Sequence, residues 1–126
     1  MMYKGKKMSI QYKKDEKKEC PWGTWEIMDI GEKYIIKKII VFPNQSLSLQ
    51  LHNHRNEHWI IVSGTASVTI GDTTQTVQEN THFYIPYGIK HRIENTTDNI
   101  VCFIEIQTGE VLDESDIIRF EDKYGR

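Results

Sequence analysis

The sequence lacks any apolar run long enough to form a membrane-spanning helix, and its start does not have the pattern of a signal peptide. Only two cysteines are present, Cys20 and Cys102, and they have neither a redox nor a metal-binding spacing. Without an export signal, a disulfide between them is not expected. We therefore expect a cytoplasmic protein with free thiols, with Cys102 buried in its apolar run.

The body of the chain also lacks a basic excess. Residues 1–19 hold seven lysines against three acids, whereas the remainder holds nine basic and fifteen acidic residues. A body without a basic face makes nucleic acid an unexpected partner. The lysine-rich start has no apolar residues at helical spacing, which is typical of a solvated, partly disordered tail. We therefore expect a tail at 1–19 and a single domain at 20–126.

Clean helical periodicity is missing as well, and short apolar segments separated by turn residues take its place. The expected strands are 34–42, 47–52, 59–62, 66–70, 82–85, 90–94 and 100–107, with a tight hairpin at Gly71-Asp72 before the polar stretch 73–76. This spacing indicates an all-β antiparallel sandwich or barrel. One short helix is expected within 113–120, capped by Asp113.

What the sequence does contain is a concentration of metal-binding side chains. All five histidines lie between His52 and His91. Strand alternation places Gln50 and His52 on one face of their segment. Burying such polar groups without a partner costs several kcal/mol, and a metal ion would supply that partner. An amide, two imidazoles and the Glu57 carboxylate are therefore a candidate metal-binding set.

The spacing of these residues resembles the two cupin motifs. In the first motif the corresponding residues are Asn44, Gln50, His52, Glu57 and Gly64. In the second they are Asn80, Pro86, Gly88, His91 and Asn95. The departures are asparagine for glycine at 44 and 80, and Gln50 for the first histidine. Asparagine accepts left-handed backbone better than most residues, so a turn is still expected at both positions. The resemblance implies a cupin barrel, a double-stranded β-helix or jelly roll.

Within the cupins, the chain is similar to the cupin domain of type II mannose-6-phosphate isomerases. The similarity covers residues 20–126 and includes the segments 21–23 (PWG), 47–59 (LSLQLHNHRNEHW) and 117–126 (IIRFEDKYGR). In many members this domain follows a nucleotidyltransferase domain. Its glycine-rich nucleotide loop is absent from this sequence, so guanylyltransferase activity is not expected. Members often have an arginine where this chain has Cys20, a position that could help to hold a phosphate.

The resemblance implies metal ligands at Gln50, His52, Glu57 and His91. Zn²⁺ suits this set, as do Co²⁺, Mn²⁺ and Ni²⁺. Arg55 is the candidate cation for the substrate oxyanion or phosphate, with a salt bridge to a neighbouring acid as the alternative. Glu105 is the candidate base if its face of the strand points inward, and a solvated edge residue otherwise.

The implied activity is the metal-dependent interconversion of mannose 6-phosphate and fructose 6-phosphate in polysaccharide or nucleotide-sugar metabolism. The alternative is a non-catalytic metallocupin that binds a sugar or sugar phosphate. An oxygen-using iron cupin is disfavoured by Gln50. Because a small barrel has strand edges to cover, and cupins commonly pair through them, a homodimer is expected.

Overall fold

The computed structural model describes residues 2–3, 6–7, 12–112 and 114–124. Its strands form three sheets. β1 (Met2–Tyr3) and β2 (Lys6–Lys7) pair as a small hairpin. The six-stranded sheet contains β3 (Lys17–Cys20), β4 (Gly23–Ile30), β5 (Tyr34–Val41), β7 (Arg55–Ser63), β10 (His82–Ile85) and β12 (Val101–Gly109). The five-stranded sheet contains β6 (Leu49–Leu51), β8 (Ala66–Ile70), β9 (Thr73–Val77), β11 (His91–Glu94) and β13 (Ile118–Glu121).

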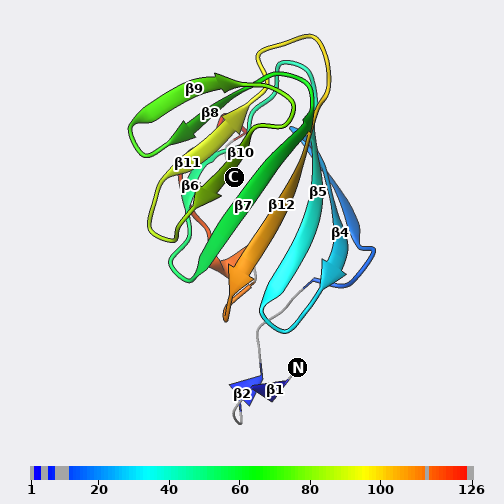
Figure 1. Ribbon diagram of the computed structural model, residues 1–126, viewed down its shortest axis with the longest axis vertical. Coiled ribbons are helices and arrows are strands. Elements are labelled where there is room, and N and C mark those ends of the chain that lie inside the picture. The colour runs from blue at the N-terminus through cyan, green and yellow to red at the C-terminus, as the bar shows by residue number, and fades with distance from the viewer. Residues whose placement is uncertain (1, 4–5, 8–11, 113, 125–126) are drawn as a thin grey trace.

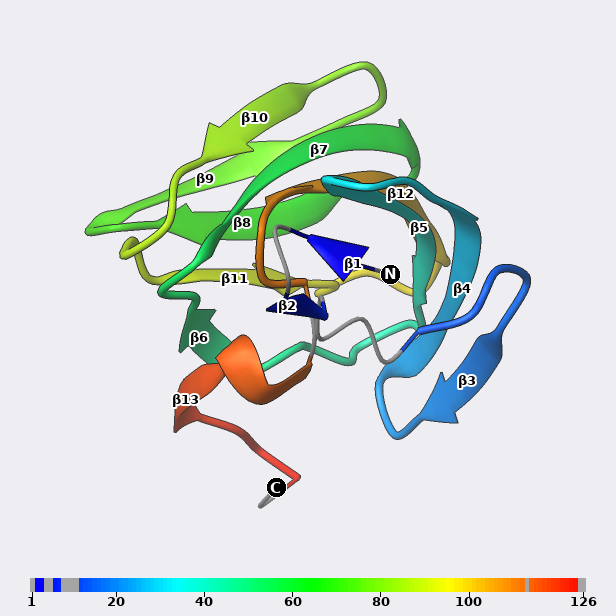
Figure 2. The ribbon, with the colours of Figure 1, turned by 90° about the horizontal axis from the view of Figure 1, so that it is seen from below.

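The two larger sheets are antiparallel and face each other around a common interior (Figures 1 and 2). Their strand orders are β10-β7-β12-β5-β4-β3 and β13-β6-β11-β8-β9. Each sheet mixes strands from distant parts of the chain, as in a jelly roll, so the expected all-β barrel is confirmed. The described residues include no helix that is long and apolar enough to cross a membrane.

The interior is divided into an apolar end and a polar end. The inward-facing residues of β7 are Arg55, Glu57, Trp59 and Ile61, and those of β12 are Val101, Phe103, Glu105 and Gln107. The two strands run antiparallel with Trp59 opposite Glu105 and Glu57 opposite Gln107. The register therefore collects the apolar side chains at one end of the barrel and the buried polar ones at the other.

Most of the expected strands are present, but the N-terminal and C-terminal regions differ from the sequence-based expectation. The N-terminal region contains more structure than expected. β3 and β4 were not expected, and β3 adds residues before position 20 to the sheet. Tyr12 is also buried and packs edge-on against Trp25. Residues 1, 4–5 and 8–11 of the predicted tail lie outside the described residues.

The predicted C-terminal helix was largely wrong. A single 3-10 turn at Glu114–Asp116 is followed by strand β13, which pairs with β6. The predicted cap, Asp113, lies outside the described residues. Pairing with an open strand edge outweighs the local helical tendency of this short segment.

The turn expectation at the two asparagines is confirmed. Asn44 has φ 59° and Asn80 has φ 71°, both in the left-handed region. Asn95, the last residue of the second motif, is buried and its amide donates to the carbonyls of Val41, Phe42 and Asn99. These asparagines shape the loops at the apolar end of the barrel, so their role is structural.

Candidate metal centre

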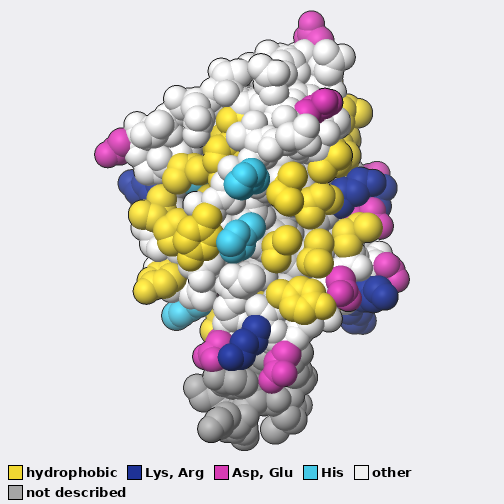
Figure 3. Space-filling model, viewed as in Figure 1, with side chains coloured by type: hydrophobic (Ala, Val, Ile, Leu, Met, Phe, Trp, Pro, Cys, Tyr) yellow, Lys and Arg dark blue, Asp and Glu magenta, His cyan; other side chains and the backbone are white. Residues whose placement is uncertain are grey.

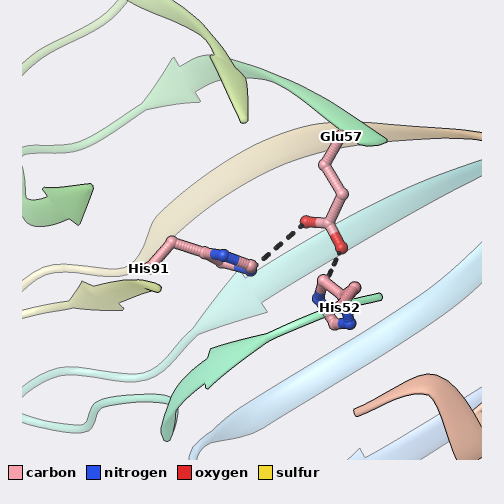
Figure 4. A group of neighbouring side chains, drawn as sticks. All are labelled: His52, Glu57 and His91. Atoms are coloured by element: carbon pink, nitrogen blue, oxygen red, sulfur yellow. Dashed lines mark ion pairs between the residues drawn. The ribbon is translucent and has the colours of Figure 1, made fainter. Parts of the chain in front are cut away.

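Three of the predicted ligands meet between the two sheets at the polar end of the barrel. His52 follows β6, Glu57 lies on β7 and His91 begins β11 (Figure 4). All three are buried, and one potential ligand atom from each lies within 4.8 Å of the others. Glu57 is central, with its Oε2 2.9 Å from His52 Nε2 and its Oε1 3.8 Å from His91 Nε2. No other group of this kind occurs in the described part of the chain.

Both imidazoles have the orientation of metal ligands. His52 Nδ1 lies 2.7 Å from the carbonyl oxygen of Asp116, and His91 Nδ1 lies 2.9 Å from that of Ile89. A carbonyl oxygen only accepts, so each Nδ1–H donates and each Nε2 is left to face Glu57. Metal-bound histidines are commonly held in this way by a hydrogen bond from the second ring nitrogen. Burial also lowers the pKa of His91, which favours the neutral, ligating imidazole.

The pKa of Glu57 favours its ionised form, and its carboxylate accepts hydrogen bonds from two residues. Arg55 contacts Oε2 through both Nε and Nη2 at 2.9 Å, and Trp59 donates to Oε1 at 2.8 Å. Burial acts to raise the pKa of Glu57, but Arg55 and the two histidines hold it well below its usual range. The site therefore combines an anionic carboxylate with two imidazole nitrogens, a donor set that suits Zn²⁺ and related divalent ions.

Gln50, the predicted fourth ligand, borders the same space but is less well fixed. It lies on β6 opposite His91 of β11, and its amide donates to Ser48 Oγ at 3.1 Å. A small cavity of about 20 Å³ is lined by Gln50, Glu57, His91 and Glu105 among others. Its ligand role remains a prediction.

The structure assigns a role to Asp116 that the sequence did not reveal. Besides accepting from His52, it receives the backbone N–H groups of Asn53 and His54 on its carboxylate, at 2.8 and 2.9 Å. It thereby fixes the loop that carries His52. This contact could not be predicted from the sequence, because the pairing of β6 with β13 is what brings residues 52 and 116 together. His54, His58 and His82 are exposed and outside the buried group.

Glu105 points inward, as its candidate role requires. It is buried, and Gln107 Nε2 donates to its Oε2 at 2.7 Å. Lys37, opposite it on β5, is buried as well and donates to Tyr12 Oη at 3.1 Å. Burial and the Glu57 charge raise the pKa of Glu105 to about 7, despite the opposing effects of Lys37, Arg55 and Gln107. Such a carboxyl can release and take up a proton near neutral pH.

Lys37 was overlooked in the sequence, although a signal was present. It occupies an inward position between Ile35 and Ile39 on an isoleucine-rich strand. A charged residue on a buried face is costly unless it is paired or functional, so the alternation itself marks it. Its ammonium lies over the rings of Tyr12 and Trp25, at 4.3 and 4.7 Å from their centroids.

A larger cavity of about 80 Å³ opens beside the metal centre. It shares Leu47, Gln50 and Glu105 with the smaller cavity, so the two spaces adjoin. Its other lining residues include tryptophans and several cations: Lys18, Cys20, Trp22, Trp25, Lys37, Ile39, Arg55, Ile117 and Arg119. Neither cysteine is in a disulfide, and Cys20 is half-buried in this lining. Cys102 was expected to be buried but is only half-buried, on the opposite face of β12 from Phe103.

The raised pKa of Glu105 predicts a pH-dependent stability difference. The folded protein binds the proton more tightly than the unfolded chain, whose pKa is 4.5. Relative to Glu105→Gln, the free energy of unfolding of the unaltered protein should therefore fall by at most ~3 kcal/mol as pH rises from about 4.5 to 7. Above pH 7 the difference should stay constant. Urea unfolding of chelator-treated protein at several pH values measures this difference. A difference independent of pH would contradict the assignment.

Comparison with known proteins agrees with this architecture. The sequence matches the family described as "Mannose-6-phosphate isomerase C-terminal" over residues 7–122. It is 50% identical over 106 residues to the xanthan biosynthesis protein XanB of Xanthomonas campestris pv. campestris (strain B100), covering 84% of this chain and 23% of XanB. It is 46% identical to the mannose-1-phosphate guanylyltransferase ManC of Salmonella typhimurium, covering 84% of this chain and 22% of ManC. The chain thus spans about a quarter of these relatives' length.

Solved structures support the fold. An oxalate decarboxylase mutant of Bacillus subtilis superposes with a TM-score of 0.71 at 22% identity, covering 83% of this chain and 30% of the other. The cupin domain of Cnp3 from Schizosaccharomyces pombe gives a TM-score of 0.66 at 15% identity, covering 73% and 74%. These likenesses concern the fold alone. With the match over residues 7–122, the chain belongs to the mannose-6-phosphate isomerase C-terminal family of cupin domains.

Proposed function

We propose that this chain, with one divalent metal ion bound, interconverts mannose 6-phosphate and fructose 6-phosphate. The observation that carries the proposal is the buried group of His52, Glu57 and His91 beside a cavity with a cationic lining. The family match supports the reaction class, and the relatives in polysaccharide biosynthesis, such as XanB, support its metabolic setting. The ion would be held by these three residues and by Gln50, with Zn²⁺ as the first choice and Co²⁺, Mn²⁺ or Ni²⁺ as alternatives.

The reaction moves a proton between C1 and C2 of the open-chain sugar through an enediol. When bound, the ion supplies a Lewis acid that polarises the carbonyl oxygen. Glu105 is the proposed base: its carboxylate takes the proton from C2 and returns it to C1, while the hydroxyl proton of O2 passes to O1. A pKa of about 7 suits both halves of that exchange. Arg55 is the proposed cation that stabilises the negative charge developing on oxygen, since its guanidinium is buried beside the site.

Burial of these groups serves the same chemistry. Arg55 and Glu105 are 3% and 6% exposed, so their charges act in an environment with little water. Electrostatic stabilisation is stronger there than at a solvated surface. The beta-strand positions of both residues hold them in fixed orientations toward the cavity. The apolar end of the barrel provides the rigid support for that arrangement.

A second candidate function is a non-catalytic metallocupin that binds sugar phosphates. Two observations favour it. Arg55 lies close to both His52 and Glu57, with Nη2 3.3 Å from His52 Nε2, so it already compensates part of the charge of the group. Cys20 borders the cavity where family members often have an arginine. The isomerase is favoured over simple binding because Glu105, a buried carboxyl in the cavity lining, is positioned to act as a base.

Turnover separates the two functions. Purified protein loaded in turn with Zn²⁺, Co²⁺, Mn²⁺ or Ni²⁺ is expected to convert mannose 6-phosphate to fructose 6-phosphate, detected by a coupled enzymatic assay. Chelator-treated protein is the control and should be inactive. Measurable binding of mannose 6-phosphate by calorimetry, without turnover under any metal, would favour the binding function and reject the isomerase.

We also propose a cytoplasmic homodimer. Neither cysteine is in a disulfide, as expected in a reducing compartment. The strands of the six-stranded sheet expose apolar side chains, among them Met28, Ile60, Val62 and Tyr84. Figure 3 shows yellow apolar patches on the face of the molecule that it presents. Such a surface is better suited to a second copy than the strand edges considered from the sequence. A monomeric mass in analytical ultracentrifugation would refute the dimer.

A further inference from the structure

We propose that Lys18 and Arg119 form the site that holds the phosphate group of the substrate, at the mouth of the 80 Å³ cavity. The proposal rests on the proposed function for its substrate class, a sugar phosphate. Among the described residues, four cations line this cavity, Lys18, Lys37, Arg55 and Arg119, against one acid, Glu105. A space with that imbalance favours an anion, and a phosphate presents several acceptor oxygens to it.

The four cations differ in depth. Lys37 and Arg55 are buried and already engaged, Lys37 with Tyr12 and Arg55 with Glu57. Lys18 and Arg119 are exposed, and neither forms an ion pair within the part of the chain that the structure describes. The outer pair can therefore take a ligand without breaking an existing salt bridge.

The fold brings this outer pair to one opening from opposite sides. Lys18 is on β3, the edge strand of the six-stranded sheet, and Arg119 is on β13, the edge strand of the five-stranded sheet. Lys18 is paired with Trp25, and Arg119 with Gln50, and both of these partners also line the cavity. The cavity lies between the two edges, so a single anion can contact both cations.

The cavity has room for such a group. Its volume is well above the ~10–15 Å³ that one water molecule requires. Gln50 and Glu105 connect this cavity to the metal centre, so the sugar carbons would extend toward the candidate base.

Cys20 offers an independent way to test the position of Lys18. Both residues are on β3, two positions apart, and both line the cavity. Alternate residues of a strand share a face, so a cation introduced at 20 should act on the same space. Arginine at position 20 is therefore expected to compensate for loss of the lysine at position 18.

The experiment measures binding of mannose 6-phosphate and of mannose to Zn²⁺-loaded protein, by calorimetry and by fluorescence of the cavity tryptophans. Lys18→Ala and Arg119→Ala are each expected to weaken binding of mannose 6-phosphate about tenfold, without changing binding of mannose or the metal content. Lys33→Ala is the control: it removes the same charge from an exposed ion pair with Glu110 and should change the binding of neither mannose 6-phosphate nor mannose. Cys20→Arg in the Lys18→Ala background should restore most of the lost affinity for mannose 6-phosphate.

The outcomes separate this site from the proposed activity. Loss of phosphate-dependent affinity in both variants supports the site even if the protein shows no turnover. An active isomerase whose affinity for mannose 6-phosphate stays within about twofold in both variants would overturn the site and leave the activity standing. Equal losses for mannose and mannose 6-phosphate would also overturn it, because they would show a general effect on the cavity.

Discussion

Replacing His91 by alanine should weaken binding of a divalent metal by at least about a hundredfold. The Nε2 of His91 faces the Glu57 carboxylate from β11, while the second ring nitrogen is held by the Ile89 carbonyl. Loss of a partner that merely orients a metal-bound histidine costs 10–100-fold in affinity, so loss of the ligand itself should cost more. His52→Ala should have an effect of the same size, because His52 Nε2 approaches the same carboxylate.

The measurement is equilibrium dialysis against Zn²⁺ or Co²⁺, followed by elemental analysis. His82→Ala is the matched control, since His82 is exposed on β10 and outside the buried group. Binding to the folded state alone adds about 2.7 kcal/mol of stability at a metal concentration of 100 Kd, so metal should raise the Tm of the control but not of the two variants. One tightly bound ion per chain in both His52→Ala and His91→Ala would disprove this metal centre.

Replacing Arg55 by alanine should lower kcat/KM for mannose 6-phosphate about a hundredfold, which corresponds to about 3 kcal/mol of transition-state stabilisation. The guanidinium contacts Glu57 and lies at the cavity, where it can stabilise charge on the substrate oxygen. The proposed metal ligands remain in place, so metal content should stay near that of the unaltered protein. Burial acts to lower the pKa of Arg55, but the Glu57 and Glu105 charges together raise it above its usual value, so Arg55 stays charged across the working pH range.

Stability must be measured alongside activity for this variant. Removing one partner of a buried ion pair costs about 3–5 kcal/mol, because the other charge is left uncompensated. Arg55→Lys keeps the charge and should retain more stability and activity than the alanine variant. Lys33→Ala is the control for loss of a cation from an ion pair, since Lys33 pairs with Glu110 at the surface, outside both cavities. A folded, metal-containing Arg55→Ala protein with unchanged kcat/KM would exclude the catalytic role.

The strand pattern and the motif spacing predicted the architecture and the centre of the site. Period-2 alternation placed Glu57 and Trp59 on one face of β7, and both are buried there. The spacing of the histidines brought His52 and His91 to the same carboxylate. These features could be predicted because they depend on local alternation and on turns with strong residue preferences, such as those at Asn44 and Asn80.

The remaining features depend on contacts between distant strands, which one sequence does not specify. Asp116 reaches His52 only because β13 pairs with β6, a segment for which a helix had been expected. Lys18 was assigned to a solvated tail, yet the pairing of β3 with β4 places it at the cavity. The sequence analysis left two alternative roles for Arg55, a salt bridge with a neighbouring acid or a contact with the substrate. The structure is compatible with both roles at once. The guanidinium is paired with Glu57 and lines the cavity at the same time.

We propose that one metal ion bound at His52, Glu57 and His91 makes this chain an isomerase. The most direct test adds Zn²⁺ or Co²⁺ stepwise to chelator-treated protein, and measures bound metal and formation of fructose 6-phosphate on the same samples. The rate is expected to be negligible without metal, to rise in proportion to the bound ion and to reach its maximum at one ion per chain. A rate that does not depend on bound metal, or full occupancy without any product, would contradict the proposal.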